Sequence, residues 1–304
     1  MDSKQLIIYG APGTGKSFLI DSKLKSLNTN EDNIIRVVFY YDYSYSDFIG
    51  YITPHTSNRN TELEYSFVPG PFSVALNKAL LNENEQIYLI IEEINRGNSA
   101  AIFGDIFQLL DRNEEGRSFY PITNRTIREY LNNNIGDDVF TNLNLGENEI
   151  VLPSNLNIIC TMNTADQNVF TLDSAFKRRF KMQYLSIDFD NRNSHLDTLD
   201  SIAKQNVFDN NHTWTEFALY VNKIIDDINY DNFTISEDKK LGQYFVEEKD
   251  VSSKQAFCDK VIYYLKNDVF KYNSNVLKED YSSIKKKFLN GYDILEEFEV
   301  DSNE

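Results

Sequence analysis

The segment Gly10-Ala11-Pro12-Gly13-Thr14-Gly15-Lys16-Ser17 lies between the apolar run Leu6-Ile7-Ile8-Tyr9 and an amphipathic stretch that begins at Phe18. This order predicts a strand, a tight loop and a helix. Its spacing fits the phosphate-loop pattern G-x-x-x-x-G-K-[ST], in which glycines let backbone N–H groups converge on phosphate oxygens at a helix start. Lys16 then neutralises the β- and γ-phosphates, and Ser17 offers a hydroxyl to Mg²⁺. We therefore expect this loop, through Phe18, to bind a nucleoside triphosphate.

The composition describes a folded, acidic chain. Of its 304 residues 41% are hydrophobic, which is enough for a buried core, and no run approaches the roughly 20 apolar residues that cross a bilayer. The net charge of −17 argues against a basic surface for nucleic acid, so any DNA contact should be local or belong to a partner. Cys160, Cys258 and the histidines show no metal or disulfide spacing. We expect a cytoplasmic protein without a membrane contact.

Further apolar runs continue the strand pattern. They lie at residues 34–40, 87–91, 156–161 and 182–187. With helical stretches between them, such as the one opened by Gly70-Pro71-Phe72, they predict a parallel sheet in an α/β domain over residues 1–187. Residues 111–150 lose this periodicity and predict an inserted hairpin or loop. The aromatic stretch 41–51 is interpreted either as packing on the sheet rim or as a platform for bases.

After residue 187 the pattern becomes helical. Thr213-Trp214-Thr215-Glu216 resembles a capping box at the start of an amphipathic helix, and residues 254–269 place Phe257, Val261 and Leu265 on one face. These features predict a small helical domain over residues 188–304.

Two acids follow the third predicted strand. Glu92 is placed to orient Mg²⁺ or its waters, although the usual acid at this position is Asp, which is one methylene shorter. Glu93 is then placed to polarise the attacking water as general base. The alternative is a surface acid pair, which would leave two carboxylates at a poorly solvated sheet edge.

Polar residues also follow the fourth predicted strand. Asn163 is placed to hold the hydrolytic water, whereas Asp166 either caps the next helix or orients a neighbouring cation. Arg178 and Arg179 stand just before the last strand. They form either a loose basic patch or planar forks aimed at a neighbour's nucleotide, and the second role requires a ring of subunits.

Four motifs therefore occur in order along the chain. They are Gly10 to Ser17, Ile91-Glu92-Glu93-Ile94-Asn95-Arg96-Gly97-Asn98, Met162-Asn163-Thr164-Ala165-Asp166 and Ala175-Phe176-Lys177-Arg178-Arg179-Phe180. Together they resemble the AAA+ motor of the McrB family, the NTPase subunits of modification-dependent restriction systems. The stretch Tyr43-Ser44-Tyr45-Ser46-Asp47-Phe48 and the Gly70-Pro71-Phe72 turn are similar to that family as well, so the resemblance covers most of residues 5–187.

The resemblance implies an AAA+ P-loop NTPase core with a helical lid, and a hexameric ring with nucleotide between subunits. It implies Mg²⁺ as cofactor, GTP as the preferred nucleotide with ATP as the other candidate, and an McrC-like partner that stimulates hydrolysis and brings the nuclease. DNA would be contacted through that partner or a separate reader domain. By position, Glu93 is catalytic, Asn163 is the first sensor, Arg178 or Arg179 is the finger supplied to the neighbour, and Arg96 contacts the adjoining subunit.

Two departures and two alternatives accompany this resemblance. The lid sensor arginine of many AAA+ proteins is replaced at best by Lys240, and we expect this chain to act without the reader domain of members that recognise modified DNA. One alternative is a MoxR-like AAA+ ATPase that remodels protein complexes. The other is a nucleotide-gated scaffold whose slow hydrolysis is incidental.

Overall fold

The computed structural model describes residues 3–56, 63–164, 170–189, 212–230, 235, 237–273 and 276–298. The chain divides into two compact units, which are described one at a time below. The first comprises Met1–Tyr9, Ser17–Met162 and Asp166–Tyr184, and the second comprises Gly10–Lys16, Asn163–Ala165 and Leu185–Glu304. The division into a core up to residue 187 and a helical domain from residue 188 stays a prediction.

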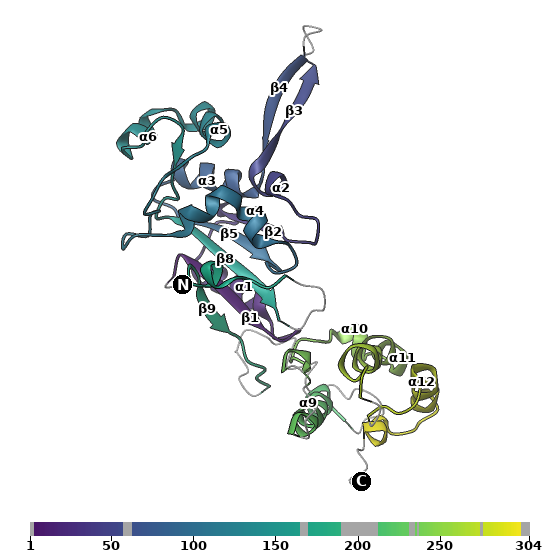
Figure 1. The fold of residues 1–304 in the computed structure, drawn as a ribbon. Helices are drawn as coiled ribbons and strands as arrows, with labels where there is room; N and C mark the ends of the chain where they lie inside the picture. Colours follow the sequence, from purple (N-terminus) through teal and green to yellow (C-terminus); the bar gives the residue numbers. More distant parts are fainter. Residues whose placement is uncertain are drawn as a thin grey trace. The chain divides into compact units, whose positions relative to one another are not determined.

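A parallel five-stranded sheet in the order β2-β5-β8-β1-β9 forms the centre of the first unit (Figure 1). Its strands are β1 (Gln5–Gly10), β2 (Ile34–Val38), β5 (Ile87–Glu92), β8 (Leu156–Asn163) and β9 (Lys181–Tyr184). The register pairs Leu6 with Lys181 and Ile91 with Cys160. Strands β5 and β8 are buried along nearly all their length, as expected of the continuous apolar runs of a doubly covered parallel sheet. The α/β class predicted from the sequence is confirmed.

Helices connect these strands. They are α1 (Lys16–Ser26), η1 (Glu31–Asn33), α2 (Tyr45–Ile49), α3 (Pro71–Leu81), α4 (Ser99–Phe103), η2 (Gly104–Leu110), α5 (Arg125–Ile135), α6 (Asp138–Asn142) and α7 (Ser174–Lys177). Helix α2 begins with a capping box between Ser44 and Asp47, and α3 begins with Pro71 in its first turn. Both starts satisfy or remove N–H groups that a helix leaves without partners.

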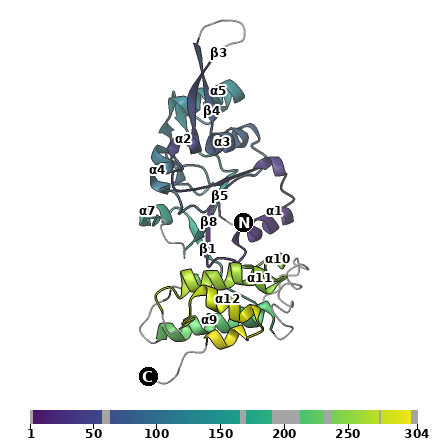
Figure 2. The ribbon, with the colours of Figure 1, turned by 90° about the vertical axis from the view of Figure 1, so that its right-hand side faces the viewer.

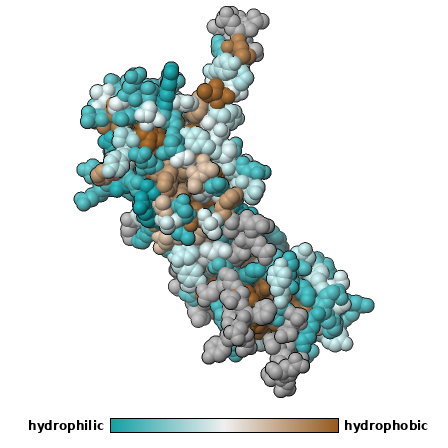
Figure 3. Space-filling view, viewed as in Figure 1, coloured by the Kyte–Doolittle hydropathy of each residue, from teal (hydrophilic) through white to brown (hydrophobic). Residues whose placement is uncertain are grey.

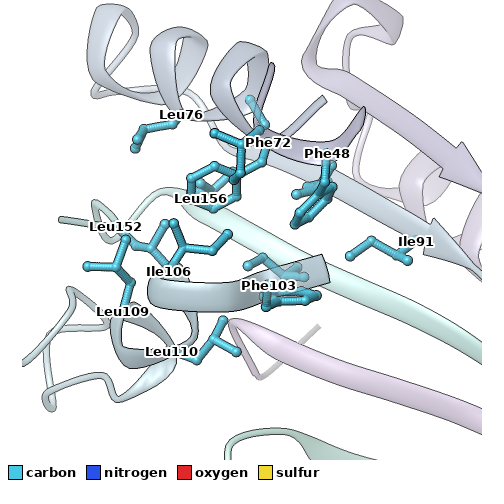
Figure 4. Packing of buried hydrophobic residues seen from close by; sticks show 14 of the residues in the cluster. Phe48, Phe72, Leu76, Ile91, Phe103, Ile106, Leu109, Leu110, Leu152 and Leu156 are labelled. Carbon is cyan, nitrogen blue, oxygen red and sulfur yellow. The ribbon is translucent and has the colours of Figure 1, made fainter. Parts of the chain in front are cut away.

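Aromatic side chains join the helices to the sheet. Phe48, Phe72 and Phe103 are fully buried and lie close to Ile91 of β5 (Figure 4). Tyr43 stacks on Phe39 with their ring centroids 4.8 Å apart. The aromatic stretch 41–51 therefore packs part of its rings into the core, which confirms the packing interpretation for its buried members.

The prediction of a hairpin or loop over residues 111–150 was wrong for residues 125–142, which are largely helical, although Arg112 and Ser118 do form an antiparallel bridge. This region contains α5 and α6 between two short paired strands, β6 (Ile122–Thr123) and β7 (Glu149–Ile150). The Asn124 side chain accepts the N–H of Ile127 at 3.1 Å and caps α5. Ile127 and Leu131, one turn apart, are both fully buried. The asparagine-rich second half of α5 hides this helix from propensity arguments.

A hairpin that the sequence did not predict extends from the first unit. Strands β3 (Gly50–Thr56) and β4 (Leu63–Pro69) pair antiparallel, and both ribbon views show them projecting from the sheet core (Figures 1 and 2). Ile52, Leu63 and Tyr65 are more than half exposed. The space-filling view accordingly shows apolar surface on this hairpin (Figure 3).

The helices of the second unit pack around their own core (Figure 2). They are α9 (Trp214–Tyr230), η3 (Glu237–Lys239), α10 (Glu248–Val251), α11 (Lys254–Phe257), η4 (Cys258–Ile262), η5 (Leu265–Val269), α12 (Tyr281–Leu289) and η6 (Ile294–Phe298). Reciprocal hydrogen bonds between Thr213 and Glu216 confirm the predicted capping box. Segments α11, η4 and η5 occupy the predicted helix 254–269, with Phe257, Val261 and Leu265 buried. Across the described ranges no helix has the length and apolarity to cross a membrane.

Candidate nucleotide-binding site

The loop between β1 and α1 has the backbone that a phosphate loop requires. Gly13 and Gly15 have φ angles of +74° and +87°, a conformation that strains residues with a side chain. Lys16 Nζ donates to the carbonyl oxygens of Gly10 at 3.0 Å and Ala11 at 2.9 Å. The lysine thus lies across the loop at the start of α1. There its ammonium group can exchange these carbonyl oxygens for the oxygens of a bound phosphate.

This loop packs closely against residues 242–245 within the second unit. The Tyr244 N–H donates to the Gly13 carbonyl at 2.7 Å, and Gln243 Nε2 donates to the Thr14 carbonyl at 3.3 Å. A Cβ atom on Gly13 would lie 2.5 Å from the Phe245 backbone nitrogen, so this position accepts only glycine. The side chain of Lys240, which was predicted as a substitute for the lid sensor, pairs its Nζ with Asp226 Oδ1 at 2.6 Å.

Ser17 and Glu92, the predicted magnesium ligands, are in direct contact. Ser17 Oγ donates to Glu92 Oε2 at 3.0 Å, and the Thr161 hydroxyl donates to the same oxygen. The other carboxylate oxygen, Oε1, pairs with Arg36 at 2.6 Å, and Arg36 also pairs with Asp21. The extra methylene of Glu92 therefore does not prevent its carboxylate from reaching Ser17.

The oxygen donors at this contact suit Mg²⁺. A hydroxyl and a carboxylate are ligands that this ion prefers, and it usually takes its other ligands from phosphate and water. In the described part of the chain, no group of three or more His, Cys, Asp or Glu side chains is placed to bind a metal without such help. The donor set of Ser17 and Glu92 thus fits a magnesium ion that arrives with a nucleotide.

Glu93 has an unusual backbone. Its φ is +56°, in the left-handed region that a residue with a side chain rarely adopts, and such outliers concentrate at functional sites. The Glu93 N–H donates to Thr161 Oγ1 at 3.1 Å, and its Oε2 lies 3.4 Å from Arg96 Nε. The Thr161 hydroxyl therefore contacts both acids. The carboxylates themselves have different partners, since Glu92 pairs with Arg36 and Glu93 lies near Arg96.

Strand β8 carries the predicted sensor at its carboxyl end. β8 continues to Asn163, three residues beyond the pair Cys160–Ile91, at the same sheet edge as the two acids. Asp166, predicted as a cap or cation ligand, lies outside the described residues.

The Cys160 thiol of β8 is neutral. Burial, and next the charge of Glu92, raise the pKa of this thiol well above its usual value.

The two finger candidates differ sharply. Arg179 pairs with Asp111 at 2.6 Å and lies over the Phe107 ring at 4.1 Å, with only 10% of its side chain exposed. Arg178 is exposed, and its side chain forms no hydrogen bond or ion pair with the residues that the structure describes. The Arg179 carbonyl accepts from Gln5 at the first residue of β1, so both arginines lie at the amino end of the sheet, away from Glu92 and Glu93.

Sequence reasoning missed the residues that orient the acids. Arg36 and Glu92 are 56 positions apart, and Thr161 and Glu92 are 69 positions apart. No sequence motif assigns a function to Arg36 or to Thr161. The only available signal was that each lies on a strand next to β5, at a register that ends beside Glu92.

Comparisons with known proteins show which family this chain belongs to. A family model described as an AAA domain of the dynein-related subfamily matches residues 5–180. The chain is 39% identical over 293 residues to the type II restriction enzyme BsuMI component YdiS of Bacillus subtilis (strain 168), covering 89% of this chain and 80% of that protein. It is 30% identical over 192 residues to the type IV methyl-directed restriction enzyme EcoKMcrB subunit of Escherichia coli (strain K12), covering 62% of this chain and 36% of that protein.

Proposed function

The chain belongs to the AAA domain family of the dynein-related subfamily and is an McrB-like AAA+ protein, and on this basis we propose that it hydrolyses GTP as the ring-forming subunit of a DNA restriction system. Nucleotide binding at the phosphate loop is the general property of this domain. The preference for GTP over ATP, the hexameric ring and the control of a nuclease are the proposal.

One observation carries the hydrolytic part of this proposal. The Ser17 hydroxyl contacts Glu92, and Thr161 joins Glu92 to Glu93, whose backbone is in the left-handed region. Mg²⁺ would be held by Ser17 and Glu92, where it would neutralise charge on the β- and γ-phosphates. Glu93 then acts as the base that polarises water, and Asn163 orients that water from β8. Lys16 exchanges its loop carbonyls for phosphate oxygens.

Arg178 completes this site from a neighbouring copy. Its exposed guanidinium lies at the sheet end opposite to Glu93 of its own chain, whereas Arg179 is held by Asp111. An arginine that neutralises charge developing on a phosphate must come from outside when its own chain places it so far away. We therefore assign the finger to Arg178 and a structural role to Arg179.

The restriction role rests on the relatives. Both are named as components of restriction enzymes, and a partner subunit of the McrC type would carry the nuclease. The net charge of −17 supports DNA contact through that partner or a separate reader domain rather than through a broad surface of this chain.

Phosphate release from GTP and from ATP in the presence of Mg²⁺ tests the proposal. We expect GTP to be the better substrate, and Glu93→Gln to bind nucleotide normally but to hydrolyse it at least about 100-fold more slowly. Glu83→Gln, which changes an exposed acid in the same way, serves as the matched control. The proposal fails if the wild-type protein turns over neither nucleotide, alone or with its partner subunit.

A further inference from the structure

A second concave site lies at the other end of the sheet. It is a cavity of about 610 Å³, lined by residues before β1, after η2 and before β9. Because β1 has six residues, this cavity lies about 20 Å along the sheet from Glu92 and Glu93. Its volume falls within the usual range for sites that bind small molecules.

The cavity is positively charged in a strongly acidic chain. Its lining contains four cationic side chains, Lys4, Arg112, Arg178 and Arg179, and two acidic ones, Asp111 and Glu114. Asp111 and Arg179 pair with each other at 2.6 Å. Three cations therefore remain against one exposed carboxylate, and such a surplus attracts anions.

Among the residues that the structure describes, Arg112 has no counter-ion. Its guanidinium donates to Gln5 Oε1 and to the carbonyl oxygens of Gly116 at 2.7 Å, Pro153 at 3.1 Å and Leu156 at 2.9 Å. All four acceptors are neutral, and one of its five N–H groups is left over. Burial lowers the pKa of Arg112 to about 10, which reflects the free energy needed to keep this charge away from water.

Lys4 adds a second positive charge to this cavity. Its Nζ donates to Gln86 Oε1 at 2.9 Å, which leaves two N–H groups for another acceptor. Burial, and next the charge of Arg112, lower the pKa of the Lys4 ammonium. Two cations thus destabilise each other at this site, and an anion between them would relieve that repulsion.

Two aromatic rings complete the lining. Phe119 and Tyr120 are 61% and 53% exposed, and their ring centroids are 4.7 Å apart in an edge-to-face arrangement. Exposed rings beside cations that line the same cavity match a ligand that joins a planar base to phosphate groups. An acidic peptide would use the cations but has no base to stack on these rings.

We propose that this cavity binds a nucleoside polyphosphate, with its phosphates near Lys4 and Arg112 and its base against Phe119 and Tyr120. The nucleotide binds from free solution, a source that does not rest on the function proposed above. A nucleotide held by the phosphate loop of a neighbouring copy is the alternative source, which the test distinguishes.

Calorimetric titration of the full-length Lys16→Ala variant tests the first source, because this change weakens the phosphate loop. We expect one equivalent of GTP to bind, and the added change Lys4→Gln to weaken binding about tenfold. Lys25→Gln, an exposed lysine on α1, is the matched control. Phe119→Ala should weaken binding of GTP but not of inorganic triphosphate, which has no base to stack.

If Lys16→Ala binds no nucleotide, the same lysine changes are compared in the otherwise wild-type protein. A loss of nucleotide-dependent assembly and hydrolysis in Lys4→Gln alone, with unchanged nucleotide affinity of the monomer, assigns the cavity to a neighbour's nucleotide and overturns the proposal. The proposal is overturned if Lys4→Gln behaves like Lys25→Gln in both comparisons. Absence of hydrolysis in the wild-type protein would refute the proposed function but leave the titration of Lys16→Ala valid.

Discussion

At the scale of single residues, two glycines allow the effect of backbone strain to be distinguished from the effect of steric collision. Gly13 and Gly136 have similar φ angles, +74° and +80°, but a Cβ on Gly13 would collide with Phe245, whereas a Cβ on Gly136 would meet nothing within 4 Å. The requirement for glycine in the phosphate loop is therefore more than a requirement for a left-handed turn.

We expect Gly13→Ala to lower the melting temperature further than Gly136→Ala and to weaken nucleotide binding at least about tenfold. Strain in the left-handed region alone costs about 1 kcal/mol, and Gly13→Ala adds a collision and displaces the loop. Thermal unfolding and nucleotide titration of both variants measure the difference. Normal nucleotide binding by Gly13→Ala would show that the contact with residues 242–245 is dispensable.

The adjacent residues Arg178 and Arg179 should have different roles, one in hydrolysis and one in stability. We expect Arg178→Ala to reduce hydrolysis by the assembled protein about 1,000-fold without changing its melting temperature, because its side chain is exposed. Arg179→Ala should instead lower the free energy of unfolding by about 2 kcal/mol, since it leaves Asp111 without its ion pair and removes the contact with Phe107. Denaturation and steady-state hydrolysis of the two variants would refute this assignment if the roles were exchanged.

At the scale of elements, the ends of β5 and β8 are joined by one hydroxyl. Thr161 donates to Glu92 and accepts from the Glu93 N–H, so a single side chain fixes both acids. The two strands are already paired up to Ile91 and Cys160, and this hydroxyl extends their alignment into the site.

We expect Thr161→Val, which keeps the shape of the side chain, to lower kcat for hydrolysis at least about tenfold with little change in nucleotide affinity. The change leaves the Glu93 N–H without its acceptor and frees Glu92 from one donor. Thr123→Val, at an exposed position of β6, is the control. A Thr161→Val enzyme with normal kcat, measured by phosphate release, would exclude Thr161 as a positioning residue.

Elements differ in how far the sequence predicts them. Strands β1, β5 and β8 are buried on both faces, so their runs of isoleucine and leucine predict them directly. The hairpin β3–β4 lacks this signal because most of its side chains are exposed, and α5 lacks it because asparagines fill its last turns. For the site, motif spacing predicted that Ser17 and Glu92 belong together, but it contains nothing about side chains that arrive from other strands, such as Arg36.

At the scale of the whole molecule, the groups that we propose for hydrolysis lie at opposite ends of the sheet of one chain. Glu92 and Glu93 follow the carboxyl end of β5, whereas Arg178 lies beside the amino end of β1, about 20 Å away by strand length. No bending of a packed parallel sheet closes that distance. If Arg178 is the finger that we propose, a complete site needs two copies arranged head to tail, as in a closed ring.

Mixing two inactive variants measures this requirement most directly. Glu93→Gln lacks the proposed base and Arg178→Ala lacks the proposed finger, so each alone should hydrolyse GTP at a background rate. In an equimolar mixture, about one quarter of the interfaces join an intact Glu93 to an intact Arg178, and we predict that hydrolysis returns to about that fraction of the wild-type rate. A mixture that stays at the background rate, or an Arg178→Ala protein that is fully active alone, would contradict a site shared between copies.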